Sequence, residues 1–511
     1  MEILHMPPME RPFTPAQEVA QLDNVHAERS AWTLTRRGLI GSTAAAVMAT
    51  ALPTPAAAAR SVLHGYDAVV VGAGFAGLAA ARRLALAGKS VLVLEARDRV
   101  GGKTLNHSIG GGAITELGAG YVGPTQDEIL KLADHYGVGT FPVNNIGDNV
   151  YFKDGQRFRY PFGGVPPDPA LVQDLAQVGA KLNAMAREVP LDAPWLAANA
   201  PDWDGQTFQT WRDQHFQTVV ARRFFDGVLH AIWGFEARES SLLYVLFYIA
   251  AAGNESTPGT LERLLGDAQQ SRLIGGTQGL ALRIAQDLGQ AVVLSTPVRR
   301  ITYDAAGVQV DGDRMSVSAK AVIVAIPTPL AGRIIYDPPL PFMRDQLTQR
   351  MPLGAYIKTE AIYDRPFWRD DGLTGQAQST EGPVRATIEG SPPSGPGILI
   401  GFIGGDIARI WGQRSAQERQ EAVLQSFAKF FGPKALQPRD YFDINWTAEP
   451  FSLGDPVPFT PPGVLLGYGD EIRKPVGPIH WAGTETSTFW NGYLEGAIRS
   501  GYRAADEVIG S

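Results

Sequence analysis

Three glycines in the first part of the chain have the spacing of a dinucleotide site. Gly72, Gly74 and Gly77 form a GxGxxG pattern directly after the apolar run 68–71, which reads as a buried parallel strand. In this pattern the first glycine makes a tight turn, the second lets a pyrophosphate approach the backbone, and the third lets helix and strand pack closely. The pattern therefore predicts a cofactor that contains ADP.

The flanking residues complete a strand, helix, strand unit that would position these glycines. We expect a helix over residues 76–87, whose free N-terminal amides and positive dipole end would face the pyrophosphate. A second strand over residues 90–94 leads to Glu95, whose carboxylate can accept hydrogen bonds from the ribose hydroxyls of the cofactor. A phosphate on that ribose would be repelled, which argues against NADP, but the pattern does not distinguish FAD from NAD.

Two segments after Glu95 resemble flavoproteins of the amine oxidase and desaturase superfamily. Residues 96–104 read ARDRVGGKT, similar to an EARxRxGGR segment that wraps the pyrophosphate and ribityl chain of FAD in that family. Lys103 stands where arginine is usual, and it keeps the charge without the planar fork of a guanidinium. Residues 116–124 read ELGAGYVGP and resemble a stretch whose glycines let the backbone approach the flavin ring.

The rest of the chain narrows this resemblance to monoamine oxidases. WAGTET at residues 481–486 and WNGYLEGA at 490–497 are similar to their C-terminal FAD motif, and the segments REVPLDAPW and PLGAYIK are not general FAD motifs. The resemblance runs from about residue 66 to about residue 508. We expect a helix over residues 492–505 with its N-terminus aimed at the flavin pyrimidine, which becomes negative on reduction.

The motifs and the resemblance together predict the residues that contact FAD. They are Gly72, Gly74, Ala76, Gly77, Glu95, Ala96, Arg97, Gly102, Lys103, Thr104, Gly118, Ala119, Gly120, Tyr121, Val298, Trp446, Gly483, Thr484, Glu485, Gly492 and Tyr493. Trp446 is expected to pack at the edge of the flavin. Since the chain has no cysteine, a thioether to the flavin is excluded, and FAD is expected to be held non-covalently unless another residue attaches it.

Two residues are predicted to act in catalysis. By the resemblance, Lys358 in PLGAYIK corresponds to a lysine that holds a water against flavin N5. A cation at that place can also stabilise superoxide while dioxygen reoxidises the flavin. Tyr493 corresponds to one member of an aromatic pair that flanks the amine in front of the flavin.

Two further positions depart from the pattern of the family. Counting back from TPPG at residues 460–463, the family's covalent cysteine falls on Asp455 and the second member of the aromatic pair falls on Pro456. Half of the pair is therefore absent or comes from elsewhere, with Phe451 and Phe459 as the candidates. This departure bears on the choice of substrate more than on the type of reaction.

The resemblance implies oxidative deamination of an amine to an aldehyde, ammonia and hydrogen peroxide. A hydride would pass from the carbon next to nitrogen to flavin N5, water would hydrolyse the imine, and dioxygen would reoxidise the flavin. An alternative is an L-amino-acid oxidase or amino-acid monooxygenase, which needs an arginine or similar cation to hold the substrate carboxylate. A third hypothesis, an FAD-binding protein without turnover, is disfavoured by the presence of Lys358.

Composition argues against several other partners and sites. A formal net charge of −7, without clustered basic residues, gives no general attraction to nucleic acid. The 8 histidines include no HExxH or similar pair, so no metal site is predicted. The partners expected from the resemblance are therefore a small-molecule amine and dioxygen, and a homodimer is compatible with the sequence.

Length and segment order predict an α/β protein with two interleaved domains. With 511 residues the chain exceeds the roughly 250 to 300 residues at which a single core stops growing. A Rossmann-like FAD-binding domain is expected from residues 66–145, 265–330 and 455–508. A substrate domain of mixed or antiparallel sheet plus helices is expected from residues 146–264 and 331–454, with the pocket between the domains.

The N-terminal segment reads as an export signal. Arg36 and Arg37 precede an alanine-rich apolar run and then four alanines, which is the order of a twin-arginine signal. Residues 1–59 are therefore expected to be a signal and disordered N-terminus, and the protein to be periplasmic or secreted. The alternative is a disordered tail with a chance arginine pair. The apolar run is too short for a stable membrane span, and the anchor helix of membrane-bound relatives is missing before Ser511, so no membrane anchor is predicted.

Overall fold

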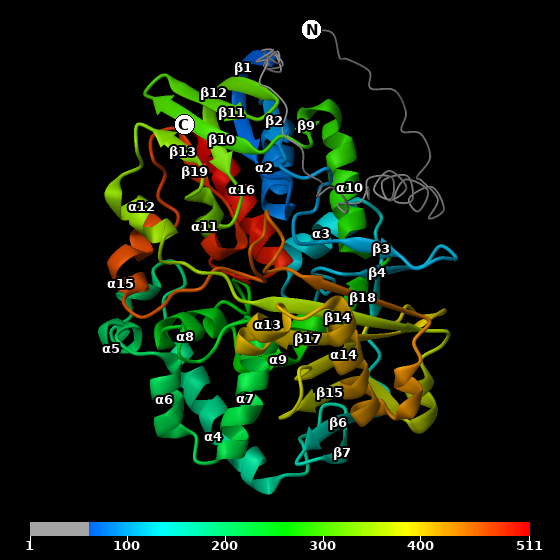
Figure 1. Ribbon diagram of the computed structural model, residues 1–511. Helices are drawn as coiled ribbons and strands as arrows, with labels where there is room; N and C mark the ends of the chain where they lie inside the picture. Colours follow the sequence, from blue (N-terminus) through cyan, green and yellow to red (C-terminus); the bar gives the residue numbers. More distant parts are fainter. Residues whose placement is uncertain (1–60, 511) are drawn as a thin grey trace, which may run out of the picture.

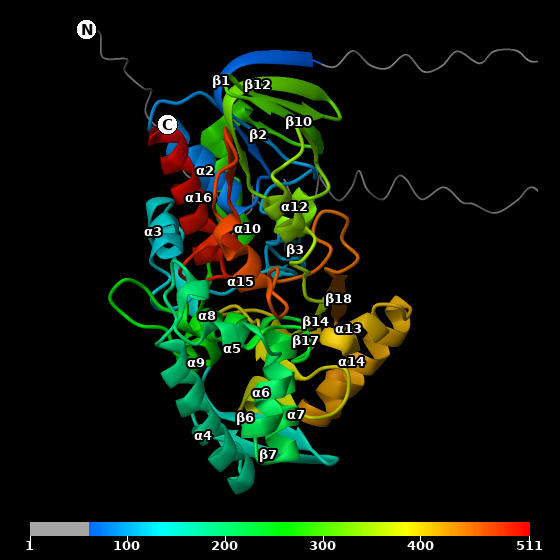
Figure 2. The same cartoon turned by 90° about the vertical axis from the view of Figure 1, so that its left-hand side faces the viewer.

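The computed structural model of the protein describes residues 61–510, and it contains two large sheets, one above the other in Figure 1. Helix α2 (Phe75–Leu86), near the start of this part of the chain, lies beside the last helix, α16 (Leu494–Gly510), in both ribbon views (Figures 1 and 2). The predicted export signal at residues 1–59 lies outside the described residues and stays a prediction.

The first sheet is built around parallel strands that are buried on both faces. Its strands, in spatial order, are β13 (Ile335–Asp337), β10 (Val298–Asp304), β11 (Gly307–Gly312), β12 (Met315–Val324), β1 (Ser61–Val71), β2 (Val91–Leu94) and β9 (Val292–Val293), with β19 (Ile479–Trp481) paired to β12. Ala68 and Val70 pack in one cluster with α2 and α16, whereas Val69 and Val71 pack in another on the opposite face. Burial on both faces explains why this strand reads as a continuous apolar run.

The predicted strand, helix, strand unit is present as β1, α2 and β2, and β1 pairs with β2 in parallel. The C-terminal helix begins after Gly492 rather than at it, because a φ of +87° at this glycine is not helical. It also continues past Ala505, since Val508 is still buried against the same cluster. The expected elements are therefore found, with shifted ends.

The second sheet is mostly antiparallel, as expected for the substrate domain. Its strands, in spatial order, are β18 (Asp440–Asn445), β14 (Tyr356–Tyr363), β17 (Gly397–Gly404), β16 (Ala386–Glu389), β15 (Leu373–Ser379), β6 (Asp148–Lys153) and β7 (Gln156–Pro161). Only β15 and β6 pair in parallel. Because side chains alternate along a strand, every second residue of β14 faces the first-sheet domain.

Helices cover both sides of the second sheet in Figure 2. One group is α4 (Pro169–Ala186), α5 (Ala200–Asp204), α6 (Phe208–His215), α7 (Val219–Ile232), α8 (Leu242–Ala250) and α9 (Leu261–Leu265), and the other is α13 (Gly405–Trp411) and α14 (Ala416–Phe431). The remaining elements are β3 (Asn106–Ser108), β4 (Ile114–Glu116), α3 (Asp127–His135), β5 (Thr140–Pro142), β8 (Ser271–Leu273), α10 (Gly276–Leu288), α11 (Thr328–Ala331), α12 (Phe342–Thr348) and α15 (Val464–Tyr468). Apolar residues of α14 such as Phe427 pack against Ile357 of β14.

One predicted domain boundary differs from the sheet topology. The boundary was expected at residue 330, but β13 pairs with β10 and so belongs to the first sheet. The middle segment of the first domain therefore extends through Asp337. A three-residue edge strand has too few residues for a pattern of its own, which is why the sequence did not indicate it.

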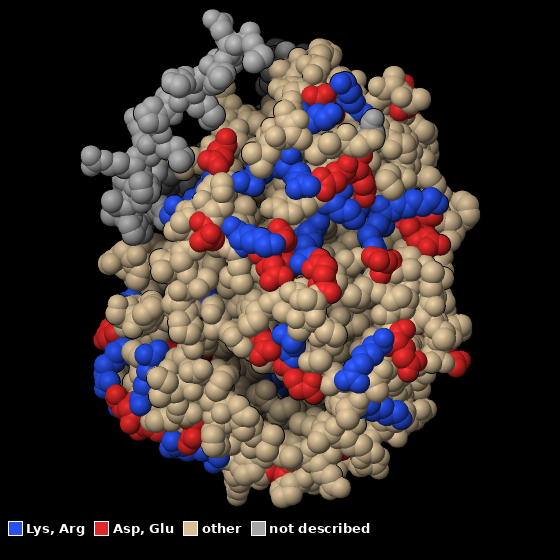
Figure 3. All heavy atoms as spheres, turned by 180° about the vertical axis from the view of Figure 1, so that it is seen from behind, with Lys and Arg blue, Asp and Glu red and all other residues tan. Residues whose placement is uncertain are grey.

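The surface on the face shown in Figure 3 carries Lys and Arg side chains interspersed with Asp and Glu, rather than one sign gathered in a patch. Within residues 61–510, no helix has both the length and the apolar character needed to cross a membrane. Nor do the His, Asp and Glu residues in this part of the chain form a group that could hold a metal ion.

Candidate active site

One cavity is lined by residues of both domains, and it collects nearly all of the predicted site residues. Those that line it are Gly72, Gly74, Ala76, Glu95, Ala96, Arg97, Gly102, Lys103, Thr104, Gly118, Ala119, Gly120, Tyr121, Val298, Lys358, Gly483, Thr484, Glu485, Gly492 and Tyr493. Two predicted residues, Gly77 and Trp446, do not line it. Segments more than 300 residues apart in the sequence therefore share one site, as between Lys103 and Thr484.

The glycine turn before α2 leaves the first amides of this helix open to the cavity. Gly74 is the N-cap residue, and no side chain caps the helix there. The carboxylate of Glu95 accepts hydrogen bonds from the backbone N–H of Ala73 (2.6 Å) and of Arg97 (2.8 Å), so it joins the turn to the end of β2. An uncapped helix N-terminus beside a cavity is a ready site for a pyrophosphate.

Gly77 acts through packing, as the GxGxxG pattern predicts. A Cβ atom at this position would overlap the carbonyl oxygen of Gly72, which itself has a φ of +101°. The missing side chain thus lets α2 approach the end of β1. This explains why Gly77 is required by the motif although it does not line the cavity.

The N-terminus of α16 reaches the same cavity from a second direction. Gly492, Tyr493, Leu494 and Ala497 all line it. The helix packs on α2 at Gly501, where a Cβ atom would overlap the carbonyl oxygen of Ala76. Two positive helix ends therefore meet one cavity, a distribution that suits a ligand with two electron-rich regions.

Lys358 projects from β14 into this cavity and is nearly buried. Its ammonium group donates to the carbonyl oxygens of Glu116 and Gly118, the latter at 2.8 Å, and lies 3.1 Å from Glu360 Oε1. The carbonyls belong to the segment whose glycines were predicted to approach the flavin. A fixed positive charge is thus held at the wall formed by that segment.

Aromatic side chains surround Tyr493 in a way that the sequence did not indicate. Tyr248, Tyr356 and Phe402 also line the cavity, and the rings of Tyr248 and Tyr493 are 6.1 Å apart. Burial raises the pKa of Tyr493, Tyr248 and Tyr356 above the ordinary value, so these phenols stay neutral. The cavity wall here is large, rigid and uncharged.

One of these missed residues could have been found from spacing. Tyr356 lies two positions before Lys358 on β14, so both side chains leave the same face of the strand. Phe402 is the cross-strand partner of Lys358, a register that only the fold reveals. Tyr248 lies in the uniformly apolar helix α8, where it reads as an ordinary core residue.

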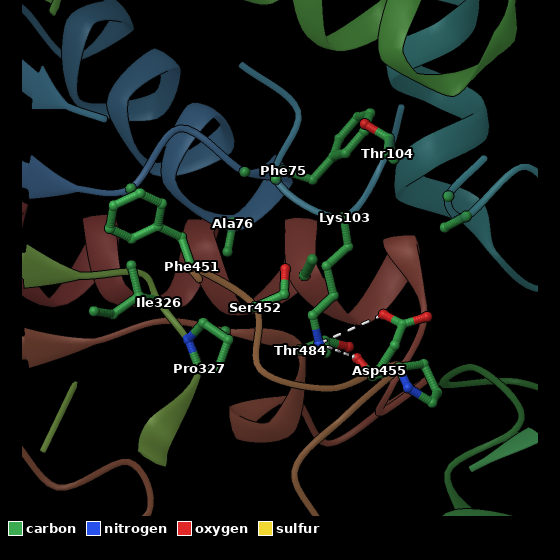
Figure 4. Close-up of a pocket in the computed structure, with 18 of the residues that line it drawn as sticks. Phe75, Ala76, Lys103, Thr104, Ile326, Pro327, Phe451, Ser452, Asp455 and Thr484 are labelled. Atoms are coloured by element: carbon green, nitrogen blue, oxygen red, sulfur yellow. Dashed lines mark hydrogen bonds and ion pairs between the residues drawn. The ribbon is translucent and has the colours of Figure 1, made fainter. Parts of the chain in front are cut away.

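The three departures from the family pattern meet in the cavity. Lys103 Nζ donates to the carbonyl oxygen of Pro456 (2.8 Å) and lies 3.5 Å from Asp455 Oδ1 (Figure 4). Burial raises the pKa of Asp455 and lowers that of Lys103, and the attraction between the two groups opposes both shifts. Lys103, which replaces an arginine, thus contacts the two other replaced positions, Asp455 and Pro456, although it lies far from them in the sequence.

Two expectations about aromatic residues are corrected by their positions. Phe459 does not line the cavity and instead packs 4.7 Å from the ring of Phe235. Phe451 does line it, but beside Ile326 and away from Asp455 (Figure 4), with Arg97 over its ring. Neither replaces the missing half of the aromatic pair.

Trp446 is fully buried behind the cavity rather than at its edge. Its indole N–H donates to the carbonyl oxygen of Leu117 (3.1 Å). Trp446 therefore supports the backbone before Gly118, which does line the cavity. The expected packing of Trp446 at the edge of the flavin stays a prediction.

The residues present fit FAD. The uncapped N-terminus of α2 and the neighbouring Glu95 suit a pyrophosphate and a ribose. A Cβ atom at Gly118 would overlap the carbonyl oxygen of Lys103, and one at Gly120 would crowd the carboxylate of Glu116, so only glycine allows this close packing. Both glycines line the cavity with backbone, and a flat ring can lie beside such a wall. The N-terminus of α16 suits the electron-rich part of such a ring.

Comparison with known proteins agrees with this reading of the cavity. A family model described as flavin containing amine oxidoreductase matches residues 75–509. The chain is 43% identical over 448 residues to the Mycobacterium tuberculosis protein AofH, whose name describes a flavin-containing monoamine oxidase, over 86% of this chain and 96% of that protein. It is 35% identical over 457 residues to an L-amino acid dehydrogenase of Synechocystis, over 87% and 95% of the two chains.

Solved structures with the same fold include two oxidases of amines. A putrescine oxidase with putrescine bound is 33% identical, with a TM-score of 0.82, over 88% of this chain and 100% of that chain. Cyclohexylamine oxidase from Brevibacterium oxydans IH-35A is 34% identical, with a TM-score of 0.83, over 87% and 98%.

Proposed function

Since the chain belongs to the flavin-containing amine oxidoreductase family and is an FAD-dependent amine oxidase, we propose that it oxidises an amine without a carboxylate group and holds FAD non-covalently. The observation that carries the proposal is one cavity lined both by the glycine turns and by Lys358 and Tyr493. Cofactor and substrate can therefore be in contact there. The reaction would yield an aldehyde, ammonia and hydrogen peroxide.

FAD, when bound, accepts two electrons from the amine at N5 and passes them to dioxygen. The residues of the chain would hold and orient the reactants. Tyr493 and Tyr248 offer ring faces to the amine, and the neutral wall around them favours the uncharged form of its nitrogen. Lys358 would stabilise the negative charge that develops on dioxygen.

The arginines of the cavity support an amine rather than an amino acid as the substrate. Of the described residues, those arginines that line the cavity are Arg97, Arg299 and Arg333, and each comes from the first-sheet domain. The guanidinium of Arg97 donates a hydrogen bond to Ser452 Oγ (2.9 Å), and Arg299 forms an ion pair with Asp313. The wall beside Lys358 and Tyr493 thus presents aromatic rings where an amino-acid oxidase would need a cation for the carboxylate.

Substrate class is tested by mixing the purified protein anaerobically with separate panels of primary amines, polyamines and L-amino acids. We expect amines to bleach the absorbance of the oxidised flavin, and admitted air to restore it with release of hydrogen peroxide. Bleaching by amino acids alone would replace this proposal with an amino-acid oxidase, a reading to which the similarity to an L-amino acid dehydrogenase also points. Bleaching by none of the compounds would count against turnover of these substrate classes.

Non-covalent attachment is supported by the absence of cysteine and by the side chains at the corresponding place. Asp455 stands at the position of the family's covalent cysteine and is paired with Lys103. Acid precipitation of the holoprotein should therefore leave all of the flavin in the supernatant. Flavin that stays with the pellet after washing in denaturant would contradict the proposal.

A further inference from the structure

A buried charge cluster surrounds Lys358, and it is larger than the proposed function requires. Lys358, Glu360, Glu116 and Arg272 are all buried, and Glu360 has no exposed surface. The cluster contains two cations and two carboxylates, so its charges balance. Buried charges are strongly unfavourable unless partners replace the water that they lose. Loss of any one charged partner in the cluster would therefore leave a buried charge uncompensated.

The ammonium of Lys358 donates two hydrogen bonds, to the carbonyl oxygens of Glu116 and Gly118, and forms an ion pair with Glu360 Oε1 at 3.1 Å. Of these three partners only Glu360 brings a full negative charge. It is therefore the counter-ion that stays with the ammonium inside the protein.

Glu360 reaches Lys358 from the side away from the cavity. Lys358 and Glu360 are two positions apart on β14, so their side chains leave the same face of the strand. Lys358 lines the cavity, whereas Glu360 does not. The second oxygen of Glu360 accepts a hydrogen bond from Thr115 Oγ1 on β4. The carboxylate is thereby fixed between two strands of different domains.

No other carboxylate of the cluster is placed to substitute for Glu360. The side chain of Glu116 accepts from Arg272 at 2.6 Å and from the N–H of Thr277 at 2.7 Å. Both of its oxygens are thus engaged on the far side of β4. The electrostatic partner of Arg272 is Glu116, which keeps the pKa of Arg272 above its ordinary value although burial alone would lower it.

We propose that Glu360 is a positioning residue for the oxidative half of the reaction, holding the Lys358 ammonium as a fixed positive charge at the cavity wall. In that half-reaction dioxygen takes two electrons and one proton from the anionic reduced cofactor and a second proton from solvent, and it leaves as hydrogen peroxide. Glu360 touches no reacting atom and acts only through Lys358. The inference rests on the role proposed above for Lys358 and adds the residue that makes the role possible.

The test measures the two half-reactions separately by stopped-flow absorbance. In the Glu360→Gln holoenzyme we expect reoxidation by dioxygen to slow by about tenfold or more, while flavin reduction by the amine changes by less than about twofold. Lys358→Met should slow reoxidation at least as much. The double variant Lys358→Met, Glu360→Gln should match Lys358→Met, because Glu360 has no effect once the ammonium is gone.

A matched control separates this role from general damage to the sheet. Glu389 is a second buried carboxylate of the same sheet, paired with Arg369 outside the cavity. Glu389→Gln should leave both half-reactions unchanged. Should Glu360→Gln fail to fold, Thr115→Val removes a hydrogen bond to Glu360 while keeping both charges, and it should slow reoxidation selectively but less.

The outcomes distinguish this inference from the proposed function. Normal reoxidation in Lys358→Met would overturn the role proposed for the lysine itself. Slow reoxidation in Lys358→Met with normal reoxidation in Glu360→Gln would overturn only the inference about Glu360. An equal loss in both half-reactions of Glu360→Gln, or additive losses in the double variant, would mean that Glu360 has a structural role or acts independently of Lys358.

Discussion

The first-sheet side of the cavity and its second-sheet side are built in different ways. On the first side the backbone forms the wall, and glycines such as Gly77 and Gly501 permit contacts that any side chain would block. On the second side large side chains form the wall, with Tyr356 and Phe402 6.0 Å apart on neighbouring strands. A backbone wall has almost no tolerance for added atoms, whereas a side-chain wall can change shape by substitution.

This difference separates the two tasks of an oxidase. Holding one cofactor in one geometry suits the inflexible wall, and choosing an amine suits the adjustable one. If the contrast is correct, substitutions that add atoms to the backbone wall should abolish FAD binding. Substitutions of the aromatic side chains, including that of Tyr493 before α16, should alter kinetics while FAD is retained. The predictions below are ordered from the largest expected effect to the smallest.

Gly77→Ala should cause the largest loss. Its new methyl group would overlap the carbonyl oxygen of Gly72, so α2 must move away from β1 and the pyrophosphate site must deform. We expect the variant to purify almost free of FAD, measured as the ratio of flavin to protein absorbance. Gly467→Ala is the matched control, because this helical glycine has open space around it. Equal FAD content in both variants would show that the backbone wall tolerates added atoms, and it would contradict the contrast drawn between the two walls.

Lys103→Met should lower stability at the junction of the two sides. It leaves Asp455, whose side chain is 15% exposed at the cavity wall, without its cation, and this lowers the free energy of unfolding by less than the roughly 3 to 5 kcal/mol expected for a fully buried pair. Burial already raises the pKa of Asp455, so the native state binds a proton more readily than the unfolded chain. The deficit should therefore shrink as the pH falls from about 7 toward about 5, measured by denaturant unfolding of the apoprotein.

The double variant Lys103→Met, Asp455→Leu provides the control for that loss. Removing both charges should recover most of the stability, since no unpaired charge is left in the cavity wall. A double variant as unstable as Lys103→Met would show that the loss came from packing of the lysine stem and not from the carboxylate.

Tyr493→Leu should keep FAD but reduce kcat/KM for the amine by about tenfold, because a ring that orients the substrate is replaced by a flexible side chain. The measurement is steady-state peroxide formation with the best amine of the panel. Tyr303→Leu, on β10 outside the cavity, should leave kcat/KM unchanged. Loss of flavin from the Tyr493 variant would instead assign this tyrosine to the cofactor side.

Tyr248→Phe should have the smallest effect, changing kcat/KM by about threefold or less, since the ring remains and only its hydroxyl is lost. Burial raises the pKa of this phenol above its ordinary value, so the neutral form persists through alkaline assay conditions. The pH profiles of the variant and the parent should coincide up to about pH 10. A shift of the alkaline limb would identify this phenol as an ionising group.

The first-sheet side could be predicted from the sequence because its motifs are local. Gly72, Gly74 and Glu95 follow one another within a single strand, helix, strand unit, so spacing alone indicates their geometry. The same holds for the turn before α16, where Gly492 and Tyr493 precede an amphipathic helix. The ends of elements were less certain, because tertiary burial sets where a helix stops.

The second-sheet side could be predicted only where family resemblance identified a residue, as at Lys358. Phe402 enters the cavity through cross-strand register, and Tyr248 through the packing of an apolar helix. Neither register nor packing is visible in a linear pattern. The replacement proposed at Phe459 was wrong for the same reason, since proximity in the sequence to Asp455 did not place it in the cavity.

The contact between α2 and α16 has a consequence for how the protein is made. Helix α2 leaves the ribosome about 400 residues before α16, the helix that packs against it at Gly501 and joins Arg83 through Asp506 at 2.7 Å. The cofactor cavity cannot be complete until α16 has been synthesised, so the finished FAD site forms only after that. A stop codon only a few residues before α16 would yield a chain with every glycine of the GxGxxG turn and no finished site to hold the flavin.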